Sequence, residues 1–373
     1  MKFTITSSAL YAQLLSISRV IVTKSAFPIL DSFLLDVQEG KLVLTGSDNE
    51  TRLSTEVPLI SQEGIGKLAI SSKMLIDGLK EVSDQPVTFE VEGVKVRVSY
   101  QNGQYELVAG NAEDYPTGSI PEEGKSQKIS IASEVLKRGL NHTIFAVGND
   151  ELRPVMNGVY LDLTDKDITF VASDGHKLIK YTTSDACGSE NGAFILPSKP
   201  GNLLKALLRN NEDQVELTFD GKQAQFIAPG LDLKCRLLEG RYPNYRSVIP
   251  TNNPFHVIVD RLSLVGALKR VQVFTSQENN LVKLDISSDQ ILLTAQDLDF
   301  SIAGEERVIC SYEGEPMKIG FKARFMIEQL LSCEAEQVQL QLADPSRPGV
   351  MIPVDSEENG ELIMLLMPLL LNE

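Results

Sequence analysis

The sequence contains no tryptophan, only three histidines and only four cysteines. Cys187, Cys235, Cys310 and Cys333 form no CxxC pair, so a zinc site is not expected. We predict reduced and mostly buried thiols instead. Three histidines do not make a convincing set of metal ligands, and the acidic residues lack the spacing of a calcium loop. The sequence therefore indicates no metal and no cofactor.

Long apolar runs and nucleotide-binding motifs are also missing. The longest apolar stretch, Leu362–Leu371, is about half as long as the roughly 20 residues of a membrane helix and contains Pro368. The N-terminal segment MKFTITSSAL alternates apolar and polar residues and is not a signal peptide. Neither GxxxxGK[ST] nor GxGxxG occurs. We expect a cytoplasmic protein that has no membrane association and no phosphate-binding loop.

The length of the chain indicates several domains, and its net charge bears on whether it binds nucleic acid. A chain of 373 residues suggests two or three domains. The net charge of −16 argues by itself against nucleic-acid binding, which usually leaves a basic surface. The distribution of charge along the chain decides whether that exclusion holds.

Three segments share a pattern in which a strand is followed by a helix. FTITSSALYAQLLSISRVI begins at Phe3, ISIASEVLKRGLNHTIFAV at Ile129 and VIVDRLSLVGALKRVQVF at Val257, which gives spacings of 126 and 128 residues. Alternating apolar residues at the start are typical of a half-buried strand, and the later apolar spacings of three and four are typical of an amphipathic helix. The residues predicted to cap these helices are Ser7, Ser8, Ser133 and Asp260.

Two further series recur at nearly the same period. KLAISSKMLIDGLKEV, AFILPSKPGNLLKALLR and MKIGFKARFMIEQLLSC repeat the strand–helix pattern. LVLTGSD, ITFVASD and ILLTAQD are apolar strands that run into predicted turns at Asp48, Asp174 and Asp297. Three series with one period indicate an internal triplication.

We therefore predict an α+β fold of three repeated domains, each with two helices packed on antiparallel sheet. The polar stretches PEEGKSQ and PTNNPF mark the boundaries and give domains at 1–121, 128–250 and 253–373. Repeated units build extended or curved bodies that symmetric association can close.

Positive charge is concentrated in the six predicted helices. The windows 8–23, 71–82, 131–145, 198–209, 260–273 and 321–333 contain 13 basic and 5 acidic residues, a net charge of +8. The remainder contains 22 basic and 46 acidic residues, a net charge of −24. If the helices lie on one side of a curved sheet, that side suits a phosphate backbone. The alternative is that the basic residues of the helices simply face solvent and bind no phosphate backbone.

The helix windows favour duplex DNA over a single strand. They contain only four aromatic residues, whereas proteins that bind single strands need stacking platforms. No helix-turn-helix, zinc-finger or RNA-recognition signature occurs. Sequence-independent and salt-sensitive contact with a duplex remains, and weak contact of this kind allows sliding. A repeat-built protein–protein adaptor that never meets DNA is the competing hypothesis.

The best candidate for catalysis is the pair Asp174 and His176 in SDGHK, because an aspartate can orient a histidine for acid–base chemistry. Asp174, however, matches Asp48 and Asp297 in the other repeats, which favours a turn-forming role. His176 has no counterpart, so it marks something specific to the second repeat.

Four segments closely resemble one family. They are RPVMNGVYLDL, VASDGHKL, LLEGRYPNYRSVIP and the terminal MPLLL, and they resemble the β sliding clamps, the β subunits of bacterial DNA polymerase III. The resemblance covers the whole chain. It implies that the chain is half of a closed ring, a head-to-tail homodimer in which six similar domains line a central hole with twelve helices. Such a ring encircles duplex DNA and tethers the polymerase, which confers processivity without catalysis.

The resemblance also implies a partner-binding groove between the second and third domains. In the family this groove takes short linear peptides from the DNA polymerase III core, the clamp loader and repair polymerases. The matching residues are Met156, Ser173, Gly175, His176, Lys177, Leu178, Pro243, Ser247, Val248, Leu365, Leu366, Met367, Pro368, Leu369, Leu370 and Leu371.

Further contacts carry over by the same resemblance. DNA contacts match Lys24, Lys73, Lys199 and the loop 148–153, which includes Asn149 and Arg153. Ring contacts match Tyr105 and Leu107 on one edge and Val273 and Phe274 on the other.

Three departures from the family pattern bear on specificity. Ser247 stands where the family often has arginine, and Leu370 replaces a frequent basic residue. Asp150 and Glu151 place negative charge in the 148–153 loop. We therefore expect a different peptide preference and a weaker DNA contact at this loop.

Overall fold

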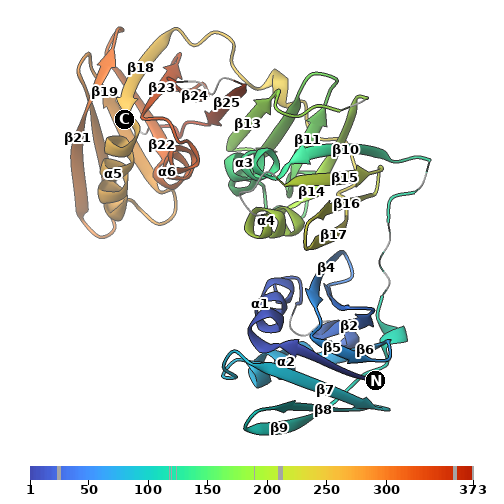
Figure 1. The fold of residues 1–373 in the computed structure, drawn as a ribbon. Coiled ribbons are helices and arrows are strands. Elements are labelled where there is room, and N and C mark those ends of the chain that lie inside the picture. The colour runs from blue at the N-terminus through green and yellow to red at the C-terminus, as the bar shows by residue number, and fades with distance from the viewer. Residues whose placement is uncertain are drawn as a thin grey trace. The chain divides into compact units, whose positions relative to one another are not determined.

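The computed structural model describes all residues except 23–26, 117, 119, 123, 189, 209–212, 356–358 and 372–373. The chain forms two compact units, one of residues 1–134 and 202–237 and the other of residues 135–201 and 238–373. Figure 1 labels their helices and strands. Both units combine antiparallel sheet with helices, as the sequence predicts. No helix in the described part of the chain is long and apolar enough to cross a membrane.

The elements follow the predicted triplication. The first repeat contains β1 (Lys2–Thr6), α1 (Ser7–Ser18), η1 (Pro28–Asp31), β2 (Ser32–Gln38), β3 (Lys41–Ser47), β4 (Thr51–Pro58), β5 (Ser61–Glu63), β6 (Gly66–Ser71), α2 (Ser72–Leu79), β7 (Pro86–Glu92), β8 (Lys95–Tyr100), β9 (Gly103–Val108) and η2 (Ala112–Asp114). The second contains β10 (Gln127–Ala132), α3 (Ser133–Thr143), η3 (Ile144–Ala146), η4 (Pro154–Met156), β11 (Gly158–Leu163), β12 (Ile168–Ser173), β13 (Lys177–Thr183), β14 (Gly192–Pro197), α4 (Ser198–Leu207), β15 (Gln214–Phe219), β16 (Gln223–Ala228), β17 (Leu231–Arg236) and η5 (Tyr245–Ser247). The third contains β18 (Phe255–Asp260), α5 (Arg261–Val271), η6 (Gln272–Phe274), β19 (Leu281–Ile286), β20 (Gln290–Asp297), β21 (Ile302–Tyr312), β22 (Met317–Lys322), α6 (Ala323–Ser332), β23 (Gln337–Leu342), β24 (Gly349–Pro353) and β25 (Gly360–Leu366).

Neighbouring repeats share sheets. One unit contains a five-stranded sheet of order β5-β1-β7-β8-β9 and an eight-stranded sheet of order β10-β15-β16-β17-β4-β3-β2-β6. The other contains a twelve-stranded sheet of order β14-β11-β12-β13-β25-β24-β23-β18-β21-β20-β19-β22. Two strand pairs therefore join the repeats: β4 pairs with β17, and β13 pairs with β25. Because of this pairing, the compact units do not coincide with single repeats.

One backbone contact recurs in every repeat. The amide of Gly110 donates to the carbonyl of Ala69 at 2.8 Å. At the matching places, Leu238 donates to Ile195 at 3.1 Å and Leu369 donates to Gly320 at 2.8 Å. Each contact ties the segment after the last strand of a repeat to the strand that precedes its second helix. In the third repeat the sheet runs from β25 through β24, β23, β18, β21, β20 and β19 to β22. The contact between Gly320 of β22 and Leu369 after β25 joins the two ends of this series.

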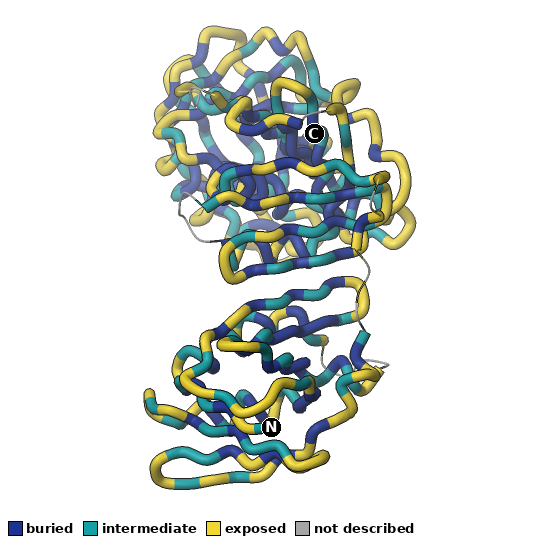
Figure 2. The backbone as a smooth tube through the Cα atoms, turned by 45° about the vertical axis from the view of Figure 1, so that its right-hand side comes forward, coloured by how far each residue is buried: buried dark blue, intermediate teal, exposed yellow. Residues whose placement is uncertain are grey.

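The core lies where the helices cover the sheets. Leu10, Leu14 and Ile17 of α1 are buried, and α1 contacts α2. In the third repeat α5 likewise contacts α6 through buried faces that include Leu268 and Leu330. Each such side chain contributes roughly 1.5–3 kcal/mol by burial. Figure 2 shows buried and exposed residues alternating along many of the strands, as period-two side-chain alternation requires.

Helix capping agrees with the sequence only in part. Asp260 caps α5 as predicted, and its carboxylate accepts from the Ser263 amide at 2.7 Å. Ser7 and Ser8 are wrong predictions, because α1 begins at Ser7 and its N-cap is Thr6. Their hydroxyls instead donate to the Ser83 carbonyl and to Asp84. These bonds tie the start of α1 to the segment before β7.

The recurring aspartates form turns, as predicted. Asp48 accepts from the amides of Glu50 and Thr51, and Asp297 accepts from those of Asp299 and Phe300. Each carboxylate thus holds two backbone amides that follow it in the hairpin, the arrangement of an Asx-type turn. Asp174 does the same in the second repeat.

Candidate functional site

The second and third repeats meet along one pair of strands. β13 and β25 pair antiparallel from Lys177 opposite Leu366 to Thr183 opposite Gly360. The amide of Met367 donates to the carbonyl of His176 at 2.8 Å and extends the pairing beyond β25. The SDGHK hairpin and the C-terminal segment of the chain therefore lie side by side, although almost 190 residues separate them.

The hairpin between β12 and β13 is fixed by its own polar groups. Asp174 accepts from the amides of His176 and Lys177 at 2.8 and 2.9 Å. The Ser173 hydroxyl donates to the Lys177 carbonyl and accepts from the Gly175 amide. Gly175 has a φ of +89°, a conformation that glycine adopts without strain. The Asp174 carboxylate accepts from backbone amides in the turn, which supports the turn-forming role.

An apolar cluster lies beside this hairpin. Its buried members come from four strands and the segment after β17: Val171, Leu178, Ile195, Tyr242, Tyr245 and Leu365. The rings of Tyr160 and Tyr242 stack with centroids 4.8 Å apart. Burial raises the pKa of Tyr242 above its ordinary value, so this phenol stays protonated. The Tyr245 hydroxyl donates to Asp162 at 3.1 Å, which anchors the segment to β11.

The predicted groove residues around this cluster fall into three classes by exposure. We name the whole set, from Met156 to Leu371 as given above, the docking surface. Its exposed members are Gly175, His176, Pro243, Ser247, Val248, Met367 and Leu370. Its buried members are Met156, Ser173, Lys177, Leu178, Leu365 and Leu366, and its half-buried members are Pro368, Leu369 and Leu371. The buried residues form a rigid base, while exposed apolar side chains such as Val248 (53% exposed) and Leu370 (81%) remain available to a partner.

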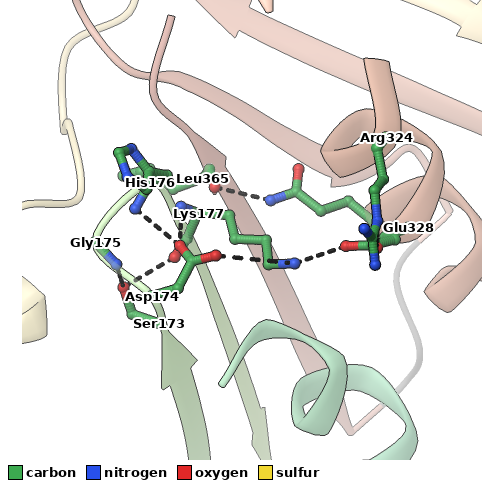
Figure 3. Close-up of polar contacts among 9 residues, drawn as sticks. Ser173, Asp174, Gly175, His176, Lys177, Arg324, Glu328 and Leu365 are labelled. Carbon is green, nitrogen blue, oxygen red and sulfur yellow. Dashed lines mark hydrogen bonds and ion pairs between the residues drawn. The ribbon is translucent and has the colours of Figure 1, made fainter. Parts of the chain in front are cut away.

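Lys177 is placed differently from the other residues of the hairpin. Its side chain is 6% exposed, and its ammonium lies 2.6 Å from the Glu328 carboxylate of α6. The Phe325 ring centroid is 4.4 Å away and that of Phe145 is 5.4 Å away. Figure 3 shows Lys177 reaching toward Glu328 while His176 points away from it. The Lys177 side chain therefore supports the hairpin from within and does not present its charge to a partner.

Arg153 lies beside the hairpin, a position that the sequence did not indicate. A Cβ atom on Gly175 would stand 2.9 Å from the Arg153 guanidinium, so only glycine lets that side chain lie so close. Nε of Arg153 donates to Asp150 at 2.9 Å, and this hydrogen bond lowers the pKa of the Asp150 carboxyl. Arg153, a predicted DNA contact, thus also donates to an acidic neighbour and lies against Gly175 of the docking surface.

The other predicted DNA contacts lie in separate elements. Lys73 is exposed on α2, Lys199 is half-buried in α4, and Asn149 is exposed in the 148–153 loop. Lys24 lies outside the described residues. These residues stay individual predictions.

Several basic residues of the helices already have partners. Arg138 pairs with Asp185 at 2.6 Å and Arg270 pairs with Glu306 at 2.8 Å, and both acids lie outside the helix windows. Arg261 donates to the carbonyls of Ala335 and Leu330. The charge available to a duplex is therefore smaller than the +8 that a count of residues gives. Arg19, Lys73 and Lys269 are exposed, and among the described residues they make no ion pair.

The predicted ring contacts lie at two sheet edges. Among the described strands, β9 pairs only with β8, and residues 302–309 of β21 pair only with β20. Tyr105 of β9 packs against Gly78 of α2, and burial raises its pKa to about 12. Phe274 covers Gly304 of β21, where an added Cβ would stand 2.4 Å from the ring. Val273 beside it is exposed.

Comparison with known proteins covers nearly the whole chain. Three family models match in order: the N-terminal domain of the DNA polymerase III beta subunit over residues 1–119, its central domain over 130–244 and its C-terminal domain over 246–368. The beta sliding clamp of Synechococcus elongatus is 28% identical over 98% of each chain, and that of Staphylococcus aureus is 24% identical over 98% of each.

Solved structures of the same kind show the same fold. The DnaN sliding clamp of Pseudomonas aeruginosa, bound to griselimycin, superposes with a TM-score of 0.93 at 25% identity and full coverage of both chains. The beta subunit from Thermotoga maritima gives a TM-score of 0.90 at 24% identity, also over both full chains. The predicted α+β fold of three repeated clamp domains is confirmed by these matches.

Proposed function

Because the chain belongs to the DNA polymerase III beta subunit family, we propose that it is a sliding clamp that closes around duplex DNA and tethers the replicative polymerase. In this role the protein confers processivity and catalyses no reaction. It works on DNA in the cell interior, and we place it in the cytoplasm. Its working domains are those at 1–121, 128–250 and 253–373.

The observation that carries this proposal is that two sheet edges, β9 and residues 302–309 of β21, each lack a strand partner on one side among the described strands. The first repeat is joined to the second by β4 and β17, and the second to the third by β13 and β25. The matching strand of the third repeat is β21, and the matching last strand of the first repeat is β9. Within the described strands, one chain leaves both edges without these partners, so a second copy arranged head to tail supplies them twice and closes a ring.

The repeat also gives the register of this contact. Thr51, Lys177 and Ile302 are equivalent, because each opposes the turn aspartate of its hairpin. Thr51 pairs with Cys235 and Lys177 pairs with Leu366, and both partners lie three residues before the recurring backbone contact. The equivalent residue of β9 is Leu107.

Leu107 of one copy therefore faces Ile302 of the other, and Tyr105 faces Gly304. Phe274 covers Gly304 and Val273 lies next to it, so the four ring contacts implied by the resemblance converge on this one site.

Helices α2 and α4, the 148–153 loop and the segment that contains Lys24 supply the contact with DNA. Lys24, Lys73, Asn149, Arg153 and Lys199 are its proposed members, and their contact is sequence-independent because it addresses phosphates. Ion pairs such as Arg270–Glu306 reduce the net positive charge. A weak and salt-sensitive contact is what a ring that slides requires.

The docking surface takes linear segments of partner proteins. Its proposed partners are the DNA polymerase III core, the clamp loader and repair polymerases. Exposed aliphatic side chains over a buried aromatic base suit an extended apolar peptide. A relative from Pseudomonas aeruginosa binds griselimycin, and we propose that this compound also binds here through the docking surface.

Primer extension on a long circular template tests this function. With the host's DNA polymerase III core and clamp loader, adding the protein is expected to lengthen the products of single binding events greatly. A protein–protein adaptor that never encloses DNA would raise polymerase recruitment without lengthening single-event products, and that outcome would contradict the proposal.

A further inference from the structure

Two consecutive residues of α6 hold the two strands that carry the docking surface. Oε2 of Glu328 accepts from the Lys177 ammonium of β13 at 2.6 Å. The neighbouring Gln329 donates from Nε2 to the Leu365 carbonyl of β25 at 2.8 Å. Leu178, which follows Lys177, pairs with Leu365 across the strands, so one helix turn contacts both sides of the junction. We propose that Glu328 and Gln329 are positioning residues that hold the docking surface in its binding conformation.

The Glu328 carboxylate is bound from two sides. Its Oε1 accepts from Nε of Arg324, one turn earlier on α6, at 2.8 Å, and its Oε2 accepts from Lys177 (Figure 3). Two charge-assisted bonds fix its rotamer more firmly than either would alone. Lys177 is enclosed by aromatic rings and has a second, weaker acid neighbour in Asp174 at 3.9 Å. Since Asp174 also fixes the hairpin turn, displacement of Lys177 is transmitted to His176.

Gln329 is wholly buried, so its hydrogen bond to Leu365 is shielded from water. Leu365 belongs to the apolar cluster, and its carbonyl precedes the strand end from which Met367 pairs with His176. Loss of the Gln329 amide leaves this carbonyl buried without that donor. The end of β25 then becomes free to shift away from the hairpin.

Comparison of the repeat junctions separates this role from ordinary fold stabilisation. Lys177 is equivalent to Thr51 at the junction of the first and second repeats. Because α4 begins at Ser198 and α6 at Ala323, Glu328 and Gln329 are equivalent to Leu203 and Leu204. That junction forms its strand pair between β4 and β17 with neutral residues at these places. The charged pair is therefore not needed to join two repeats, and it occurs at the junction that carries the docking surface.

Buried ion pairs contribute little net stability, because desolvation offsets the attraction. Their better-supported role is to select one arrangement among several of similar energy. A pair that only stabilised the fold would change the unfolding temperature and leave ligand affinity alone. A positioning pair changes affinity in protein that remains folded.

The inference rests on the proposed function of the docking surface, and the test uses griselimycin as the probe. Its Kd is measured by calorimetry for the full chain and for Glu328→Gln, at a temperature well below the unfolding midpoint. We expect binding to weaken about tenfold, because the hairpin loses a defined support. Glu334→Gln, the same change at an exposed site just beyond α6, is expected to leave Kd unchanged.

Two further measurements keep the test decisive. Hydrogen exchange of the Met367 amide is expected to accelerate in Glu328→Gln, since its bond to the His176 carbonyl depends on the hairpin position. Gln329→Met acts on the other strand and is expected to weaken binding similarly, which serves if Glu328→Gln does not fold. Equal Kd values for the folded variants and the full chain overturn the inference. Failure of the unaltered chain to bind griselimycin refutes instead the proposed docking surface.

Discussion

Ile302→Asp tests the register proposed for the ring contact. Ile302 begins β21 and is 41% exposed in the single chain. Opposite Leu107 of a second copy its remaining surface becomes covered, which is worth about 1 kcal/mol. An aspartate at position 302 loses this contribution of the covered isoleucine surface. Its carboxylate is also buried without a partner, which costs about 2 kcal/mol more.

The ring doubles this effect, because a head-to-tail dimer contains the contact twice. The total loss is about 6 kcal/mol, which corresponds to a dissociation constant about 10⁴-fold higher. Sedimentation equilibrium measures the dimer dissociation constant directly. The matched control is Ile227→Asp, because Ile227 is also 41% exposed and lies on β16, away from the proposed contact. If the two variants dimerise equally well, the proposed register is refuted.

Three other expectations follow from the described contacts. Asp174→Ala removes the acceptor of two backbone amides and is expected to lower the free energy of unfolding by about 1–2 kcal/mol in urea titration, whereas Asp174→Asn loses much less; equal losses would contradict the turn-forming role. The pKa of the Asp150 carboxyl lies below its ordinary 3.8 because Arg153 donates a hydrogen bond to it. The pair therefore stabilises the loop fully above pH 3.8, and this stabilisation is lost as the pH falls through the lowered pKa. In Arg153→Gln, NMR titration of Asp150 should show its midpoint return toward 3.8. Lys73→Gln removes one exposed positive charge on α2 and is expected to speed diffusion of the ring along duplex DNA and to weaken its salt dependence, measured by single-molecule tracking; unchanged diffusion would remove Lys73 from the DNA contact.

Local patterns in the sequence predicted much of the fold. Among the described residues, α2 to α6 lie within their predicted windows and α1 begins one residue before its window, because apolar spacing and helix boundaries are properties of short segments. The turn aspartates were identified through their recurrence, and their hydrogen bonds confirm that interpretation. Ser7 and Ser8 failed as caps because distant residues, Ser83 and Asp84, accept from their hydroxyls instead.

The features that could not be predicted from the sequence depend on contacts between residues far apart in the chain. Lys177 was expected to face a partner, but strand alternation next to Leu178 points it toward α6, where Glu328 lies 151 residues further along the chain. Tyr242 and Tyr245 form the base of the docking surface because their segment packs across β12 and β14. Both tyrosines lie in LLEGRYPNYRSVIP, one of the segments that resemble the clamp family, and the dipeptide Tyr242–Pro243 also matches Tyr115–Pro116 in the first repeat.

Topological retention on DNA tests the central claim of an encircling ring most directly. The labelled protein is loaded by the host's clamp loader onto nicked circular DNA, freed of unbound protein, and followed before and after one restriction cut. A closed ring is expected to stay on the circle for as long as the ring remains shut and to leave the linear molecule rapidly through its ends. Departure at the same rate from circular and linear DNA would contradict the account, since it would mean that the protein holds DNA by surface contact alone.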